Sequence, residues 1–140
     1  MTVERIPGKQ PDETLKQFVR KFSTLEGRQP RAMVCQNQER KADEKVKVIS
    51  VDLAGLGFDV DIGIPSDSFK ELGMNAIEND ADVLILLLPP SDLNREFVSD
   101  LEEFFSEKGY SDLLILNLPE DYSPQYFIEV LIQWFEQTLE

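Results

Sequence analysis

The sequence predicts an α/β domain in which a parallel β-sheet is covered by helices on both faces. Three observations support this prediction. Segments with apolar residues at three- and four-residue spacing alternate along the chain with short apolar runs, as expected when helices alternate with strands. The run 83–88 is continuously apolar and is closed by two prolines, which is typical of a central strand buried on both faces. Each helical segment is also long enough for the crossover that parallel strands require.

The first half of the chain is predicted to hold two helices and two strands. Both helices show an apolar stripe and end close to a glycine, where a positive φ angle is favourable. The elements are a helix from about Pro11 to Gly27, a strand over 31–36, a helix through Val46 that ends at Gly57, and a strand over 58–62. The second strand alternates apolar and acidic residues, which indicates an edge or half-buried position in the sheet.

The second half is predicted to hold three helices and two strands. Ser68 and Glu71 have the spacing of a capping box, and Ser123 followed by Pro124 is a typical helix start. The elements are a helix from Ser68 toward Ile77, a strand over 83–88, a helix from Ser91 or Asp92 to Gly109, a strand over 113–116, and a helix from Pro124 to Leu139. This order predicts a flavodoxin-like (Rossmann-like), doubly wound parallel sheet of four or five strands with helices on both faces, plus an N-terminal helix.

Size and composition indicate one folded domain. The chain has 140 residues, of which 41% are hydrophobic and 29% charged. No apolar run approaches the roughly 20 residues of a membrane helix, and no signal peptide is recognisable, so we expect a cytoplasmic protein. The chain contains no histidine, which removes the commonest general base and metal ligand. The single Cys35 is expected to be a buried hydrophobe, since no histidine can activate it.

Charge is distributed unevenly along the chain. Residues 1–50 hold eleven basic and seven acidic residues, whereas residues 51–140 hold three and twenty, so the net charges are +4 and −17. The acidic part disfavours nucleic acid and anionic membranes as partners. The basic part could contact an acidic surface of another protein, and a solvated surface that keeps the protein soluble is the alternative.

Other charged groups give no stronger indication of a site. Asp59 and Asp61 follow the alternation of a strand, so we expect a solvated surface there rather than a metal site. The basic residues around Arg40 and Lys45 could bind a phosphate at a helix N-terminus, but stretch 37–47 has no glycine for close backbone approach.

About two thirds of the chain, from about Gly27 to Tyr122, resembles the cobalamin-binding domain of methylmalonyl-CoA mutase and its relatives. The residues that carry the resemblance are Lys47-Val48-Ile49, Leu56-Gly57-Phe58-Asp59-Val60-Asp61-Ile62-Gly63 and Ala76-Ile77-Glu78-Asn79-Asp80. We therefore divide the chain into an N-terminal helical extension, residues 1–28, and a cobalamin-binding-domain-like α/β domain, residues 29–140.

The resemblance implies a cobalt site that this chain has lost. The family carries Asp-x-His-x-x-Gly after its first strand: the histidine ligates cobalt from below, the aspartate orients the histidine, and the glycine lets the backbone approach the nucleotide tail. Alignment without gaps on Lys47-Val48-Ile49 places Arg40 at the aspartate, Ala42 at the histidine and Lys45 at the glycine. In this register Leu87 lies near a family serine beside the dimethylbenzimidazole. These four positions are predicted to be vestigial, and we expect no cofactor, no catalytic residue and no metal ligand.

The resemblance also implies a fifth strand, for which the sequence has no obvious segment between Tyr122 and Phe127. The edge left by such an omission would be available for pairing or would need a cover, for instance the N-terminal helix.

The function predicted from these departures is that of a non-catalytic protein that acts by binding another protein. It would be similar to the inactive small subunit of some methylmalonyl-CoA mutases, with a mutase catalytic subunit or a second copy as its partner. Two alternatives stay open. One is weak cobalamin binding, with the cofactor's own dimethylbenzimidazole on cobalt, as an accessory or carrier for the mutase. The other is a small-molecule or phosphate sensor that reuses the loops at the strand ends.

Overall fold

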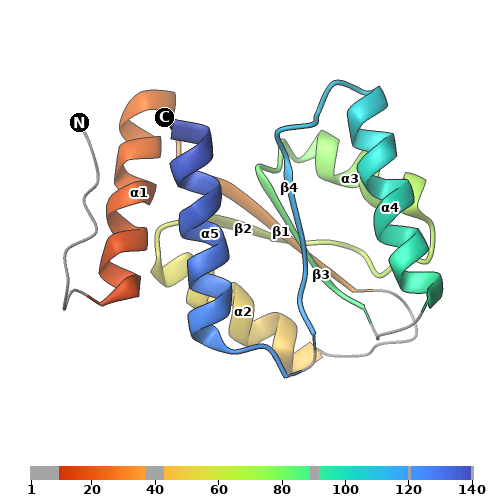
Figure 1. Ribbon diagram of the computed structural model, residues 1–140, viewed down its shortest axis with the longest axis horizontal. Helices are drawn as coiled ribbons and strands as arrows, with labels where there is room; N and C mark the ends of the chain where they lie inside the picture. Colours follow the sequence, from red (N-terminus) through yellow and green to blue (C-terminus); the bar gives the residue numbers. More distant parts are fainter. Residues whose placement is uncertain (1–9, 37–42, 89–91, 120, 140) are drawn as a thin grey trace.

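Four parallel strands form the centre of the domain (Figure 1). The computed structural model describes residues 10–36, 43–88, 92–119 and 121–139. The strands lie in the order β2-β1-β3-β4. They are β1 (Arg31–Gln36), β2 (Asp59–Ile62), β3 (Val83–Leu87) and β4 (Leu114–Asn117). The predicted doubly wound parallel sheet is therefore confirmed, with four strands in the described part of the chain.

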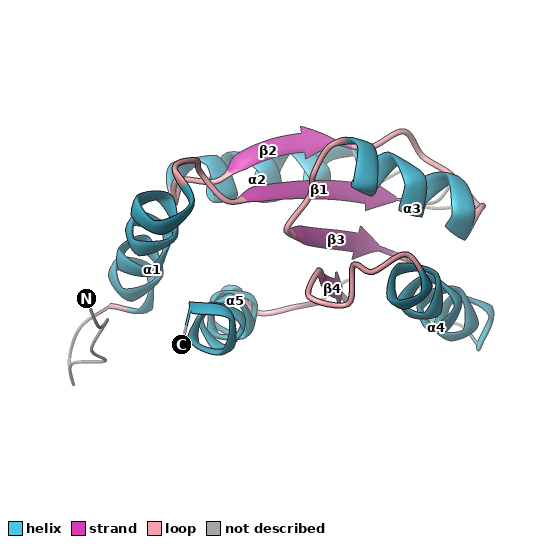
Figure 2. Cartoon of the chain, turned by 90° about the horizontal axis from the view of Figure 1, so that it is seen from above, coloured by secondary structure: helices cyan, strands magenta, loops and turns pink. Residues whose placement is uncertain are grey.

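Helices cover both faces of the sheet, and each face has its own apolar core. Figures 1 and 2 show one group of helices on each side of the strands. One face carries α1 (Pro11–Glu26), α2 (Asp43–Gly55) and α5 (Pro124–Leu139), and the other carries α3 (Phe69–Glu78) and α4 (Asp92–Glu107). Because side chains alternate along a strand, Val34 points into the first core and Cys35 into the second. The strands β1 and β3 are buried on both faces, as a central position requires.

The apolar stripe of α1 packs inside the molecule. Phe135 of α5 lies at the centre of the contact, with its ring 6.0 Å from the rings of both Phe18 and Phe22. Val19 lies against Gly57, where an added Cβ would come within 2.8 Å of the valine Cγ1. Gly57 also has a φ of +104°, so this turn after α2 depends on glycine for two reasons.

The predicted capping box at the start of α3 forms only in part. The Ser68 hydroxyl accepts a hydrogen bond from the Glu71 N–H at 3.3 Å, as expected. The Glu71 carboxylate does not return to the Ser68 N–H; it accepts a hydrogen bond from the Ser66 hydroxyl at 3.0 Å, and that hydroxyl accepts from the Ser68 N–H. Ser66 therefore takes over the second half of the cap.

The outer edge of β4 is not covered by α1. The helix α1 packs on α5 and lies at the far side of the molecule from α4, as Figure 2 shows. The N-terminal helix, suggested above as one cover for this edge, thus completes the first core instead. None of the helices in the described ranges has the length and apolar character needed to cross a membrane.

Candidate functional site

The ends of the four strands meet at one edge of the sheet, and local hydrogen bonds hold the segments that follow them. The Gly63 N–H donates to the carbonyl of Val34 at 2.9 Å, and the Ser66 N–H donates to that of Gln36 at 3.3 Å. These bonds tie the segment after β2 to the end of β1. In parallel sheets with helices on both faces, ligands bind outside this carboxyl edge. The carboxyl edge is therefore the candidate binding site.

The end of β4 is attached to the end of β3 in the same way. The side-chain oxygen of Asn117 accepts a hydrogen bond from the Leu88 N–H at 3.3 Å, and the Leu118 N–H donates to the carbonyl of Leu86 at 2.9 Å. Asn117 itself is exposed. Its amide orders the end of β3 while remaining at the surface of the candidate site.

Apolar side chains are also exposed at this edge. Ile62 at the end of β2 is 61% exposed and Ile64 is 77% exposed, although β-branched residues of this size are usually buried. The motif at residues 56–63 pointed to the end of β2 as part of the resemblance, but it did not predict that the side chains of Ile62 and Ile64 face solvent. These apolar side chains lie at the β2 end of the carboxyl edge, and the amide of Asn117 lies at the β4 end, with β1 and β3 between them. An edge with this spread of groups suits a large ligand that carries both apolar surface and amide groups.

The structure describes two of the four predicted vestigial positions. Arg40 and Ala42 lie outside the described residues. Lys45 is half-buried in the first turn of α2. Leu87 is fully buried and belongs to the same core as Leu118. The space beside the end of β3, on the face of the sheet that carries α1, α2 and α5, is therefore filled by leucine side chains.

Cys35 cannot supply a metal-binding thiolate at this edge. It is fully buried next to Gly63, whose Cα lies so close that an added Cβ would collide with the cysteine Sγ. Burial raises the pKa of the thiol to about 12, although a hydrogen bond from the Gly63 backbone opposes the shift. This agrees with the expectation that Cys35 is a buried hydrophobe.

Carboxylates on β2 do not assemble a cation site. Asp59 and Asp61 are both exposed on this edge strand. Among the described residues, no three histidine, cysteine, aspartate or glutamate side chains are grouped closely enough to hold a metal ion. The basic loop that could bind phosphate lies largely outside the described part, so a phosphate sensor stays a prediction.

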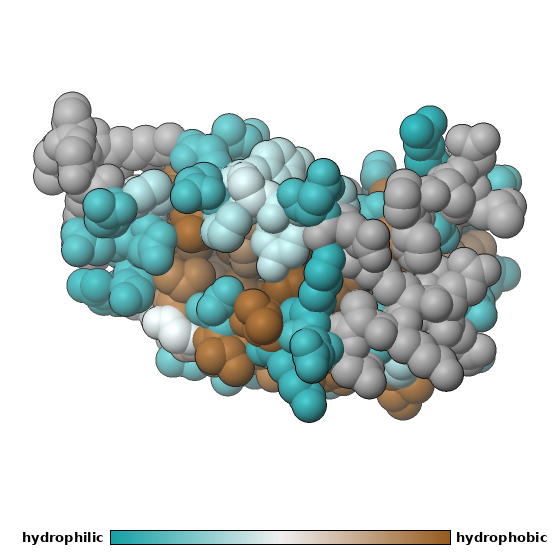
Figure 3. Space-filling model, turned by 90° about the horizontal axis from the view of Figure 1, so that it is seen from below, coloured by the Kyte–Doolittle hydropathy of each residue, from teal (hydrophilic) through white to brown (hydrophobic). Residues whose placement is uncertain are grey.

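A separate hollow lies beside the helices of the first core. It has a volume of about 560 Å³ and lies between the start of α1, the end of α2 and the start of α5, with Val51, Tyr122, Phe127 and Ile128 among its lining residues. Figure 3 views the molecule from below and shows apolar side chains gathered among hydrophilic ones on this side. Leu87 is not among the lining residues, so the hollow does not open the filled space at the end of β3.

Comparison with known proteins shows similarity to methylmalonyl-CoA mutases. The chain is 30% identical over 102 residues to the methylmalonyl-CoA mutase of Cereibacter sphaeroides, and 30% identical over 116 residues to the human mitochondrial methylmalonyl-CoA mutase. These alignments cover 73% and 80% of this chain. Among solved structures, a cobalamin-binding protein from Desulfitobacterium hafniense aligns with a TM-score of 0.51 and 12% identity, over 90% of this chain and 60% of that one. No family model matches the sequence.

The chain is related to the cobalamin-binding domain of the methylmalonyl-CoA mutase family. This confirms the resemblance carried by the motif around Gly57–Gly63. The mutase relatives are much longer: the alignments cover 14% of the Cereibacter enzyme and 15% of the human one. This chain thus corresponds to a small part of each mutase.

The expectation that no cofactor belongs to this mutase-related domain was wrong. It was based on the replaced signature residues, whereas the structural neighbour is named as a cobalamin-binding protein and the sequence relatives are methylmalonyl-CoA mutases. Loss of one ligand does not remove the rest of a binding surface, because a large cofactor makes many contacts beside the metal bond.

Proposed function

We propose that this domain binds cobalamin at the carboxyl edge of its sheet with the cofactor's own dimethylbenzimidazole on the lower face of cobalt. We further propose that it serves methylmalonyl-CoA mutase as a non-catalytic accessory or carrier. One observation carries the first proposal: the chain has no histidine at any of its 140 positions, so it has no imidazole to offer cobalt.

The two sulfur atoms of β1 support this assignment. Cys35 and Met33 are at most 1% exposed in the core between the sheet, α3 and α4. The thiol of Cys35 is also protonated at neutral pH, because burial raises its pKa to about 12. Burial thus keeps the sulfur atoms of Cys35 and Met33 from cobalt, as expected if cobalamin brings its own axial base.

The filled space around Leu87 supports the same form of the cofactor. The resemblance implies that related domains house the dimethylbenzimidazole beside this position, away from cobalt. Here Leu87 and Leu118 are fully buried, and Leu116 is 6% exposed. A cofactor whose base remains on cobalt does not need this space.

The residues proposed to hold the corrin ring lie on the rim of the sheet. Ile62 and Ile64 would contact its apolar surface, and the amide of Asn117 would pair with the amide side chains at its periphery. When bound, adenosylcobalamin supplies radical chemistry. We assign no catalytic residue to this chain, because it corresponds to only 14–15% of the length of the mutases it matches.

Electron paramagnetic resonance tests the proposed cobalt ligation directly. Purified protein labelled uniformly with ¹⁵N is mixed with cob(II)alamin of natural isotope content, and the nitrogen superhyperfine splitting on the cobalt lines is recorded. We expect the triplet pattern of ¹⁴N, since the ligating nitrogen belongs to the cofactor. A doublet pattern would show a nitrogen ligand from the protein and would refute the proposal.

Two controls make the assignment specific. Cobinamide, which lacks the nucleotide tail and its base, should bind without nitrogen splitting. The substitution Ile64→Asp should weaken cobalamin binding. Val48→Asp, on the exposed side of α2, is the matched control. Ile77→Asp is unsuitable as a control because Ile77 packs in the core. Absence of any cobalamin binding by equilibrium dialysis would reject the cofactor assignment itself. The accessory role predicts no mutase turnover by this chain alone.

A further inference from the structure

The outer edge of β4 has backbone groups that are positioned to pair with another strand. β4 pairs with β3 in register, with Leu84 opposite Ile115. The N–H groups of Leu114 and Leu118 donate to carbonyls at the two ends of β3. Because successive residues of a strand point their N–H and C=O groups to opposite edges, those of Ile115 point away from β3. An edge of this kind is a template for strand addition.

A hollow with an aromatic floor runs along this edge. Its volume is about 600 Å³, and it lies between α4 and α5 with Phe105, Leu113, Ile115 and Trp134 among its lining residues. The Trp134 indole N–H donates to the carbonyl of Asp112 at 3.3 Å, which ties α5 to the segment that leads into β4. The floor is therefore held in place before any partner arrives, which lowers the entropic cost of binding.

The residues around the edge are strongly acidic. Glu102 and Asp112 line the hollow, and a second hollow of about 330 Å³ at the start of β4 adds Glu26, Asp80 and Asp82. Two of these five carboxylates are in ion pairs, Asp82 with Arg28 and Asp80 with Arg31. The other three, Glu26, Glu102 and Asp112, leave the lining of the two hollows acidic. A partner that carries basic side chains is favoured by this charge distribution.

We propose that an extended segment of a partner protein, with apolar and basic side chains in alternation, adds to the outer edge of β4. Its backbone would pair with Ile115, its apolar side chains would lie on the face that carries α5 and contact Trp134, and its basic side chains would lie on the face that carries α4 and face Glu102. Asp112 adds a carboxylate at the start of β4. A second copy of this chain is disfavoured as the occupant, because its net charge is −13 and pairing two β4 edges would oppose like charges. This inference is independent of cobalamin binding, which is proposed at a different edge of the sheet.

The test uses a synthetic peptide of alternating lysine and valine, labelled with fluorescein, and the full chain. We expect saturable binding by fluorescence anisotropy, and no binding of the peptide in which glutamate replaces lysine. Two further peptides are N-methylated, one at every lysine and the other at every valine. Each pattern blocks the hydrogen-bonding groups along one edge of the extended peptide, so one of the two peptides should bind and the other should not. Binding should also slow hydrogen exchange at the backbone amide of Ile115, which faces outward.

Charge-reversal variants locate the site on the protein. Glu102→Lys and Asp112→Lys should each weaken binding of the lysine peptide about tenfold, whereas Glu103→Lys, the neighbouring exposed position of α4, should not. Equal binding by all variants, or equal loss with both methylated peptides, would overturn the proposal. So would sedimentation of the peptide-free protein as a dimer in which hydrogen exchange at the Ile115 amide is already slow, since that result would assign the edge to a second copy.

Discussion

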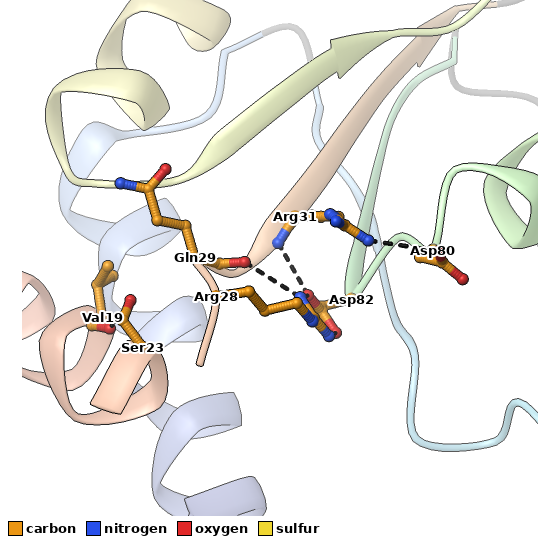
Figure 4. Close-up of polar contacts among 7 residues, drawn as sticks. All are labelled: Val19, Ser23, Arg28, Gln29, Arg31, Asp80 and Asp82. Atoms are coloured by element: carbon orange, nitrogen blue, oxygen red, sulfur yellow. Dashed lines mark hydrogen bonds and ion pairs between the residues drawn. The ribbon is translucent and has the colours of Figure 1, made fainter. Parts of the chain in front are cut away.

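The guanidinium of Arg28 forms a two-pronged ion pair with the carboxylate of Asp82, with Nη1–Oδ2 and Nη2–Oδ1 distances of 2.8 and 2.9 Å (Figure 4). The same carboxylate accepts a hydrogen bond from the Arg31 N–H at 2.8 Å. Asp82 precedes β3, whereas Arg28 and Arg31 flank the start of β1. One side chain thus sets where the two central strands begin. The pair raises the pKa of Arg28, mainly through the hydrogen bond with Asp82.

Asp82→Ala is expected to lower the free energy of unfolding by about 1–3 kcal/mol, because it removes the acceptor of the Arg31 N–H together with the ion pair. Asp82→Asn should cost less, since its amide oxygen can keep the bond to that N–H. Urea denaturation measures both. Asp80→Asn is the control: its pair with Arg31 is longer, at 3.3 Å, and its side chain is 71% exposed, so we expect a change below about 0.5 kcal/mol. Equal losses in all three variants would contradict this explanation.

Gly63→Ala should destabilise the fold by about 1–3 kcal/mol, because the new methyl group would overlap the sulfur of Cys35. In the background Cys35→Ala the sulfur is absent, and the cost of Gly63→Ala should largely disappear. A double-mutant cycle on unfolding free energies measures this coupling. Gly55→Ala is the matched control: no atom lies within 4 Å of its added Cβ, and we expect stabilisation by about 0.5–1 kcal/mol.

The stability of the protein should fall at alkaline pH partly through Cys35. Its pKa is raised from 9.0 to about 12 in the folded state, so the unfolded chain loses the thiol proton first. The contribution is present below pH 9 and is lost as the pH rises toward 12. Denaturation curves between pH 8 and about 11 should show a smaller decline for Cys35→Ala than for the unsubstituted protein. Rapid alkylation of the native thiol at pH 8 would argue against its burial.

Leu87→Ala is expected to cost about 2–5 kcal/mol of stability, since the side chain is fully buried among other leucines. Leu25→Ala, at a position 61% exposed, should change stability by less than about 0.5 kcal/mol.

The proposal that the dimethylbenzimidazole stays on cobalt adds a functional outcome for the variant at Leu87. Leu87→Ala should keep its affinity for cobalamin at temperatures where it remains folded, because the dimethylbenzimidazole is not placed beside this residue. A large gain in affinity would indicate that the opened space receives the base.

Most elements of the fold could be predicted because each depends on neighbouring residues. The glycine at position 57 and the cap at Ser123 are local signals, and the structure gives the first a positive φ and the second a hydrogen bond from the Tyr126 N–H. The role of Ser66 in the cap of α3 was not predicted, because the Glu71 side chain chooses between two nearby partners. Such a choice depends on the path of the preceding loop.

The candidate site was predicted less completely. The motif around Gly63 pointed to the carboxyl edge, yet reasoning from four replaced positions led to the wrong expectation that no cofactor belongs here. The exposed Ile62 and Ile64 and the bridging amide of Asn117 were not identified, because a side chain's exposure depends on which elements cover it. An edge of β4 available for pairing was one of two outcomes anticipated from the sequence, the other being a cover such as the N-terminal helix, and α1 does not provide that cover.

The order of elements, the parallel sheet, the missing imidazole and the relationship to the mutase family were determined by the sequence alone, because periodicity, composition and motifs are properties of the chain itself. The tertiary structure decided that α1 joins the core through Phe135, that Asp82 aligns two strand starts and that Leu87 fills the space at the end of β3. It also decided that, within the described residues, the outer edge of β4 borders an acidic hollow. These features depend on residues far apart in the sequence, so packing and pairing in three dimensions settle them.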